Sequence, residues 1–194
     1  MKKIVSELSR REQLTELLKA AGWYEGRCID ISEFQAICEE ENIDIFESAE
    51  KFLREFSGIK NVVYLSYDKD DKRCGYDFSF DFYITALCEN LSFNKKHLSL
   101  EIRPTLWKEY EEKGEQFDDY EDFEAIMEFA KEDCICVGLF GYYYPGIMAV
   151  GKSGKLYIKH DYGDIVEAFD NIIDAIEYEL RCHPELVAVS SNQE

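Results

Sequence analysis

The sequence predicts an α+β fold, in which a central, mostly antiparallel sheet is packed against N-terminal helices and a C-terminal amphipathic helix. Apolar residues recur with helical spacing in residues 1–60, alternate with a period of two in the middle of the chain, and return to helical spacing near the C-terminus. Helices followed by strands, without a repeated strand–helix–strand order, favour this class over a parallel sheet. The 194 residues fit one domain. We place that domain at residues 1–189 and expect residues 190–194 to form a disordered tail.

Three helices are predicted in the N-terminal part of the chain. The first begins with a capping box at Ser9 and ends at Gly22, because glycine commonly closes a helix. A second capping box, Ser32–Gln35, begins a short helix. The third helix covers about residues 47–57, where apolar side chains recur at helical spacing before Gly58.

Two strands follow, separated by a polar turn, and a briefer alternation at Leu98, Leu100 and Ile102 predicts a further strand. Residues 62–67 are rich in β-favouring side chains, and from Tyr76 to Thr85 aromatic and polar residues alternate, as in a strand with one buried face. The turn between them carries Asp68 and Asp70 at the spacing of a calcium loop. Lys72 stands at the next ligand position and the required glycine is absent, so we expect an ordinary turn without calcium.

The C-terminal half is predicted to contain three helices and a hairpin, and the first of these helices is a short one from Pro104 onward. A helix over about residues 119–131 precedes a strand over 134–140. The final helix is expected to run from about Asp164 to His183-Pro184, with apolar residues on one face, Ile165 and Phe169 among them.

Residues Gly146–Ser153 match the phosphate-binding pattern G-x-x-x-x-G-K-[ST], but their context contradicts its mechanism. A phosphate loop needs a strand before the first glycine and a helix beginning near the lysine. Here residues 147–150 are a continuous apolar run, and residues 155–158 are another β-favouring run. The segment therefore predicts a β-hairpin with a Gly-Lys-Ser-Gly turn, and a nucleotide-binding enzyme is the least favoured of the functions considered.

The charge balance limits the classes of partner. The chain has 41 acidic and 22 basic residues, for a net charge of −19, which repels nucleic acids and anionic membranes and attracts basic proteins. Residues 109–133 alone contain 12 acidic residues and two lysines. The alternative is that this acidity serves only solubility.

No cofactor, metal or catalytic site is predicted, and we expect a protein that is not an enzyme. The seven cysteines are an odd number without a regular framework, which favours reduced thiols in the cytoplasm. No signal peptide is recognised at the start, and no apolar run approaches the ~20 residues that cross a bilayer. Cys134 and Cys136 lack the spacing of a zinc or redox motif and are expected to be small core residues.

Two segments suit protein recognition. One is the acidic stretch with aromatic residues among its carboxylates, and the other is a run of three tyrosines between two strands with a glycine on either side. The alternative interpretation is a solvated helix face and a packed aromatic loop. The predicted partner-binding residues are Glu115, Asp118, Asp119, Tyr120, Glu121, Asp122, Tyr142, Tyr143 and Tyr144.

A set of motifs remains to be explained: Leu18-Lys-Ala-Ala-Gly-Trp23, Gly26-Arg27, Phe52-Leu-Arg-Glu-Phe56 and Gly58, with a looser set at Val137-Gly138, Gly146–Val150 and Gly154–Tyr157. Through these motifs the chain resembles a known family, the third subfamily of the SUKH (Smi/Knr-like) immunity proteins. The chain departs from the family pattern at Lys152-Ser153, where members often carry an acidic residue, and in the longer, more acidic segment 103–133.

The resemblance implies an α+β fold without catalysis and a role as a bacterial antitoxin. Such a protein would bind and neutralise the cognate toxin of a polymorphic or contact-dependent system by stoichiometric occlusion. The toxins are frequently nucleases, whose basic surfaces an acidic protein could cover. The alternative is a regulatory adaptor of the wider superfamily, which would bind several cellular proteins. No catalytic residues carry over from the family.

Overall fold

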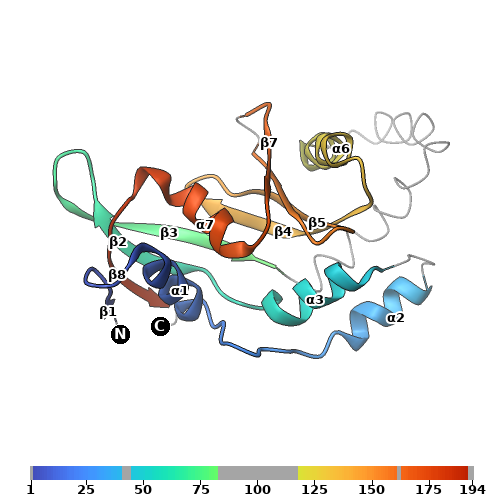
Figure 1. The fold of residues 1–194 in the computed structure, drawn as a ribbon, viewed down its shortest axis with the longest axis horizontal. Helices are drawn as coiled ribbons and strands as arrows, with labels where there is room; N and C mark the ends of the chain where they lie inside the picture. Colours follow the sequence, from blue (N-terminus) through green and yellow to red (C-terminus); the bar gives the residue numbers. More distant parts are fainter. Residues whose placement is uncertain (1, 41–44, 83–117, 161–162, 192–194) are drawn as a thin grey trace.

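The computed structural model describes residues 2–40, 45–82, 118–160 and 163–191, and they form an α+β structure (Figure 1). Its sheet has eight strands in the order β1-β8-β2-β3-β4-β5-β6-β7. Every neighbouring pair is antiparallel, which confirms the predicted fold class. The strands are β1 (Lys3–Ile4), β2 (Val62–Tyr67), β3 (Arg73–Asp81), β4 (Cys134–Tyr142), β5 (Gly146–Gly151), β6 (Leu156–Lys159), β7 (Val166–Phe169) and β8 (Leu186–Ser191).

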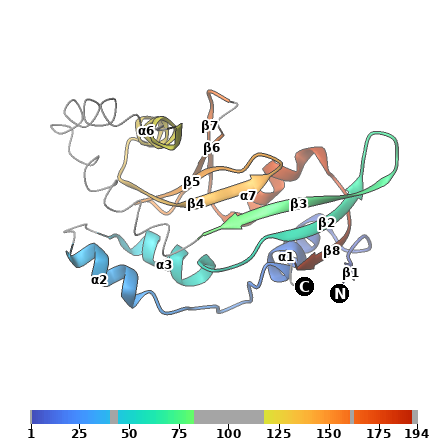
Figure 2. The same cartoon turned by 180° about the vertical axis from the view of Figure 1, so that it is seen from behind.

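Helices cover both faces of this sheet, as the view from behind also shows (Figure 2). The larger core cluster joins the sheet to four helices, and a smaller one, around Ile126, Ile147 and Tyr157, lies under α6. Side chains alternate along β5 between the two clusters, so the clusters lie on opposite faces. The helices are α1 (Arg10–Ala20), α2 (Ser32–Glu40), α3 (Glu47–Phe56), α6 (Asp118–Ala130), α7 (Ile172–Glu179) and the 3₁₀ turn η1 (Leu180–Cys182). Among the described residues, no helix is both long and apolar enough to cross a membrane.

The N-terminal helices lie where the sequence predicts, with one difference at a cap. The Glu12 carboxylate accepts the backbone N–H of Ser9 at 2.9 Å, and Gly22 has a φ of 104°, as expected of a capping box and a closing glycine. At α2 the N–H and hydroxyl of Ser32 instead donate to the Asp30 carboxylate. The Gln35 amide donates to Glu50 of α3, so it does not complete the predicted second capping box.

The C-terminal prediction was wrong in two places. The segment from Asp164 does not start a helix, because residues 166–169 form β7 and α7 begins only at Ile172, where the Asn171 side chain accepts the N–H of Asp174. Ile165, predicted to be on the buried face, is 69% exposed. The tail boundary is also wrong for residues 190 and 191, which pair with β2 as part of β8. Residues 192–194 lie outside the described residues, as do the strand predicted near residues 98–102 and the segment 103–117.

The Gly146–Ser153 segment is a hairpin, as predicted. It forms β5 and the turn to β6, and Gly154 has a φ of 88°. Glu132 holds the turn, because its carboxylate accepts the Ser153 N–H at 2.6 Å and the Tyr157 hydroxyl at 2.6 Å. Burial raises the pKa of Glu132, but these hydrogen bonds outweigh it and leave the pKa below its ordinary value. The Lys152 side chain is exposed to solvent, and its ammonium lies 3.6 Å from the Asp133 carboxylate.

We expect Gly138→Ala to lower the free energy of unfolding by about 2 to 4 kcal/mol. Gly138 lies at a register shift in β4 with a φ of 138°, and an added Cβ would meet the carbonyl oxygen of Asp81 at 2.1 Å. Urea denaturation measures the change. The control is Gly75→Ala in β3, where the new Cβ makes an ordinary contact with Leu65 at 3.6 Å. Equal stability changes in the two variants would contradict this account.

Candidate functional site

Five of the residues predicted to bind a partner lie in the first turns of α6. Asp118, Asp119, Tyr120 and Glu121 begin the helix, and Glu115 lies outside the described residues. Asp122 has a different place from the one expected. Its carboxylate forms an ion pair with the Lys159 ammonium at 3.1 Å, and the two side chains are only 11% and 10% exposed. Asp122 therefore attaches α6 to the sheet, and its charge is already partly matched.

The three predicted tyrosines form the loop between β4 and β5, here called the tyrosine loop (residues 142–145). Tyr143 and Tyr144 are 75% and 60% exposed, whereas Tyr142 is half-buried against the larger core. Tyr143 has a φ of 69°, which is uncommon for a residue with a side chain. The Tyr144 N–H donates to the Tyr142 carbonyl at 2.9 Å, so the loop is a tight turn that presents two neighbouring rings.

A buried histidine and glutamate hold this loop from below. His160 Nε2 lies 2.9 Å from Glu179 Oε1, and His160 Nδ1 lies 3.1 Å from the Tyr144 carbonyl oxygen. Because a carboxylate and a carbonyl both accept, the imidazolium form of His160 satisfies both contacts by donating from each ring nitrogen. Glu179 Oε2 also accepts the Tyr142 N–H at 3.4 Å. We call these two side chains the His–Glu frame.

The glycines that flank the tyrosine run make room for this frame. A Cβ on Gly141 would lie 2.7 Å from Glu179 Oε2, and one on Gly146 would lie 2.7 Å from His160 Nδ1 and 2.5 Å from the carbonyl oxygen of Lys159. Any larger residue at either position would displace the frame. The two glycines therefore allow buried side chains to reach the backbone of the loop.

The environment of His160 favours its charged form. Burial lowers the pKa of His160, but the hydrogen bond and charge of Glu179, the Tyr144 carbonyl and the charge of Glu167 together raise it above its ordinary value. Lys159 links this frame to α6, because its ammonium pairs with Asp122 and also donates to the His160 carbonyl at 3.0 Å. Lys159 at the end of β6 thus connects Asp122 of α6 with the backbone of His160, whose ring contacts the tyrosine loop.

Beside the loop, aromatic rings extend from the core to the surface. Tyr76 packs on His183 at 4.2 Å between ring centroids, and His183 lies 4.8 Å from Tyr142. Burial, together with the charge of Arg10, lowers the pKa of His183, and its Nδ1 lies 2.6 Å from the hydroxyl of Tyr64. The rings border a groove of about 870 Å³, here called the tyrosine groove. It is lined by Ser66, Tyr67, Asp68, Lys69, Asp71, Tyr76, Tyr142, Cys182, His183, Pro184 and Glu185.

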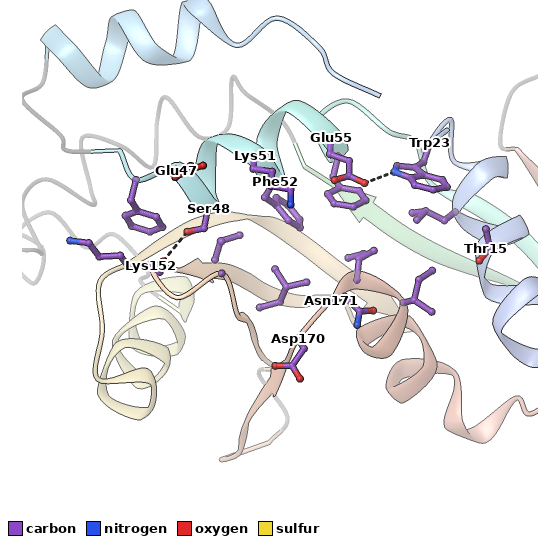
Figure 3. Close-up of a pocket in the computed structure, with 18 of the residues that line it drawn as sticks. Thr15, Trp23, Glu47, Ser48, Lys51, Phe52, Glu55, Lys152, Asp170 and Asn171 are labelled. Carbon is purple, nitrogen blue, oxygen red and sulfur yellow. Dashed lines mark hydrogen bonds between the residues drawn. The ribbon is translucent and has the colours of Figure 1, made fainter. Parts of the chain in front are cut away.

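A second cavity, of about 760 Å³, lies between α1, α3, the β5–β6 hairpin and the start of α7, and we call it the helix groove (Figure 3). Its interior is apolar, with Phe52 and Ile172 among the lining residues. Trp23 closes one side, where its indole N–H donates to Glu55 at 3.0 Å. The charged lining residues are balanced between three bases and three acids: Arg11, Lys51, Lys152, Glu47, Glu55 and Asp170.

The described residues contain no cluster suited to a metal ion, and the two cysteines of β4 lie in the core. In the described part of the chain, no three histidine, cysteine or acidic side chains gather to hold a metal ion. Cys134 and Cys136 pack in the core cluster under α6. Burial, with the charges of Glu132 and Asp133, raises the pKa of the Cys134 thiol to about 12, so it stays protonated and unreactive near neutral pH.

Comparison with known proteins places the chain in a family. The sequence profile described as SUKH-3 immunity protein matches residues 10–178. The chain belongs to the SUKH-3 immunity protein family. Membership supports a bacterial immunity role and implies a cognate toxin as partner. No curated protein and no solved structure gives a significant match.

The SUKH-3 motifs meet at the helix groove. Trp23, Phe52, Glu55 and Phe56 all line it, and the Arg27 guanidinium donates to the carbonyls of Glu55 and Ser57 at 2.6 Å each. The sequence contains both motifs, but it gave no sign that they share a cavity. The His–Glu frame was also missed, since nothing in the pattern around His160 or Glu179 distinguishes them from other polar residues of the chain.

We expect Glu179→Gln to lower the pKa of His160 below its value in the wild-type protein. The substitution removes the charge that offsets burial, which alone lowers a histidine pKa. With the pKa raised by folding, His160 stabilises the wild type fully below its ordinary pKa, and this contribution is lost as the pH rises through the raised value. The variant should lose that pH dependence. NMR titration of the ring measures the midpoint, and His183 is the internal control. An unchanged His160 midpoint would show that Glu179 is not the cause.

Proposed function

We propose that this SUKH-3 protein acts in the bacterial cytoplasm by binding its cognate toxin stoichiometrically and covering the toxin's substrate-binding surface. The tyrosine loop and the first turn of α6 would form the contact. The observation that carries this proposal is the pair of exposed rings, Tyr143 and Tyr144, fixed on a buried His–Glu frame. Tyrosine rings exposed side by side on a backbone that is held in one conformation suit an interface.

Rigidity matters because binding costs conformational entropy. Tyrosine supplies a large contact area with few rotatable bonds, and a loop already held in one conformation loses less entropy when a partner docks. The hydrogen bonds from His160 and to Glu179 fix the loop before the partner arrives. We therefore infer that Tyr143 and Tyr144 act as anchors.

The acidic helix would supply attraction over distance. The residues at the start of α6, Asp118, Asp119 and Glu121, belong to the stretch with 12 acidic residues in the sequence. A toxin that cleaves nucleic acid needs a basic substrate-binding surface, and opposite charges accelerate encounter. A basic nuclease is therefore the toxin class that we propose.

We expect Tyr143→Ala with Tyr144→Ala to weaken toxin binding about tenfold or more, since truncating anchor residues at an interface typically has an effect of this size. The toxin domain encoded beside this gene is the ligand, and calorimetry and rescue of growth on co-expression are the measurements. Tyr24→Ala is the matched control, because Tyr24 is 59% exposed at another site. If the double variant binds and rescues like the wild type, the loop is not the contact. Recovery of many host proteins, and no toxin, in a pull-down would favour the adaptor alternative.

We expect the triple variant Asp118→Lys, Asp119→Lys and Glu121→Lys to slow association with the toxin, with a smaller effect at high salt. Asp122 stays unchanged because it is paired with Lys159. The control reverses three exposed carboxylates elsewhere, Glu7, Glu25 and Glu39. Stopped-flow association rates at two salt concentrations separate the variants. Equal slowing in both sets would assign the effect to net charge rather than to α6.

A further inference from the structure

We propose that the tyrosine groove is the receptor for an arginine side chain of the partner, held by stacking on Tyr76 and Tyr142 and by the carboxylates at the rim. This inference rests on the proposed function and names the chemistry of the partner group beside the exposed loop. Aromatic faces and carboxylates together favour a planar cation.

The composition of the groove is the first argument. Three tyrosines line it, and its charged lining residues are three carboxylates, Asp68, Asp71 and Glu185, against one amine, Lys69. The helix groove, by contrast, has equal numbers of acids and bases among its lining residues. Of the two cavities, only the tyrosine groove therefore discriminates by charge, and it selects a cation.

The carboxylate of Asp68 is fixed in place as an anion. It accepts the N–H groups of Asp70 and Lys72 at 2.8 and 3.0 Å through one oxygen. The hydrogen bond from Lys72, then that from Asp70, holds the pKa of Asp68 below its ordinary value. Asp71 follows with a φ of 56°, and both Asp71 and Glu185 are exposed. Asp68 thus keeps its negative charge over the physiological pH range.

The chain already shows how its tyrosines bind a guanidinium. Arg73 lies over the ring of Tyr67 at 5.7 Å and donates its Nε–H to the Tyr67 hydroxyl at 3.3 Å. Arg181 stacks on Tyr178 at 4.0 Å. Tyr76 and Tyr142 stand edge to face, 6.1 Å apart, and both are half-buried at the groove wall. An arginine from outside would complete the same kind of contact there.

The test uses a probe that does not involve the toxin. The ¹⁵N-labelled protein is titrated with the capped tripeptide Gly-Arg-Gly, and with Gly-citrulline-Gly, which has the same shape without the charge. We expect saturating amide shifts around Tyr67, Tyr76 and Tyr142 with the arginine peptide and much smaller shifts with citrulline. Gly-Lys-Gly should bind more weakly than the arginine peptide, since lysine lacks the planar stacking face. Equal binding of the citrulline peptide, or shifts spread over the acidic surface without saturation, would overturn the assignment.

Two sets of variants locate the binding. Tyr142→Leu should weaken the arginine peptide about fivefold or more, whereas Tyr142→Phe, which keeps the ring, should stay within about twofold of the wild type. Asp71→Asn with Glu185→Gln, both at exposed positions, should weaken binding and reduce its salt dependence. Retained binding in Tyr142→Leu would place the site elsewhere.

The same variants tested against the toxin separate the two proposals. Loss of neutralisation in Tyr142→Leu with retention in Tyr142→Phe supports an arginine anchor in the interface. Equal neutralisation by both variants overturns that part of the inference. Failure of the wild-type protein to neutralise the toxin would overturn the proposed function alone, because the peptide titration reports on the groove independently.

Discussion

The ion pair between His160 and Glu179 connects the end of β6 to the end of α7 inside the protein, and the outer loop depends on it. The pair contacts the Tyr144 carbonyl and the Tyr142 N–H, two backbone groups of the tyrosine loop. Positions 141 and 146 require glycine because a Cβ there would collide with Glu179 or His160. The loop that carries the two exposed rings is therefore held by two buried polar side chains, His160 and Glu179, and its rigidity comes from their contacts.

Local sequence patterns were sufficient to predict many of the helices and strands of this fold. The limits of β2 and the turn after Tyr67 follow from alternation and polar residues, and α1 follows from its capping box and Gly22. The error at residues 164–171 arose because Ile165, Phe169 and Ile172 have helical spacing by coincidence, while the true start is the Asn171 cap. The apolar run from Leu186 to Val189 was readable as a strand and was overlooked.

The candidate site was harder to predict from the sequence, because its contacts join residues that are far apart in the chain. Exposure of Tyr143 and Tyr144 could be expected from the flanking glycines, but the loop is held by His160 and Glu179, which lie 16 and 37 positions after the loop residues that they contact. Asp122 is a second example, in which a residue predicted to be exposed is buried by a distant partner. It looks like one more solvated acid in a charged stretch, yet Lys159 draws it into the interior. Composition indicates how much charge a segment carries, and only the tertiary structure decides which charges face a partner.

The order of the strands in the sheet also constrains how the protein folds. β8 follows the other strands in the chain but lies between β1 and β2. During synthesis, β2 therefore emerges from the ribosome long before its neighbour exists, and one of its edges stays open until β8 has been made. Pairing over such a sequence separation is slow compared with local hairpins. Because β8 is the last of these strands in the chain, the complete sheet forms only after that strand has docked, and a function that depends on the whole fold begins only then.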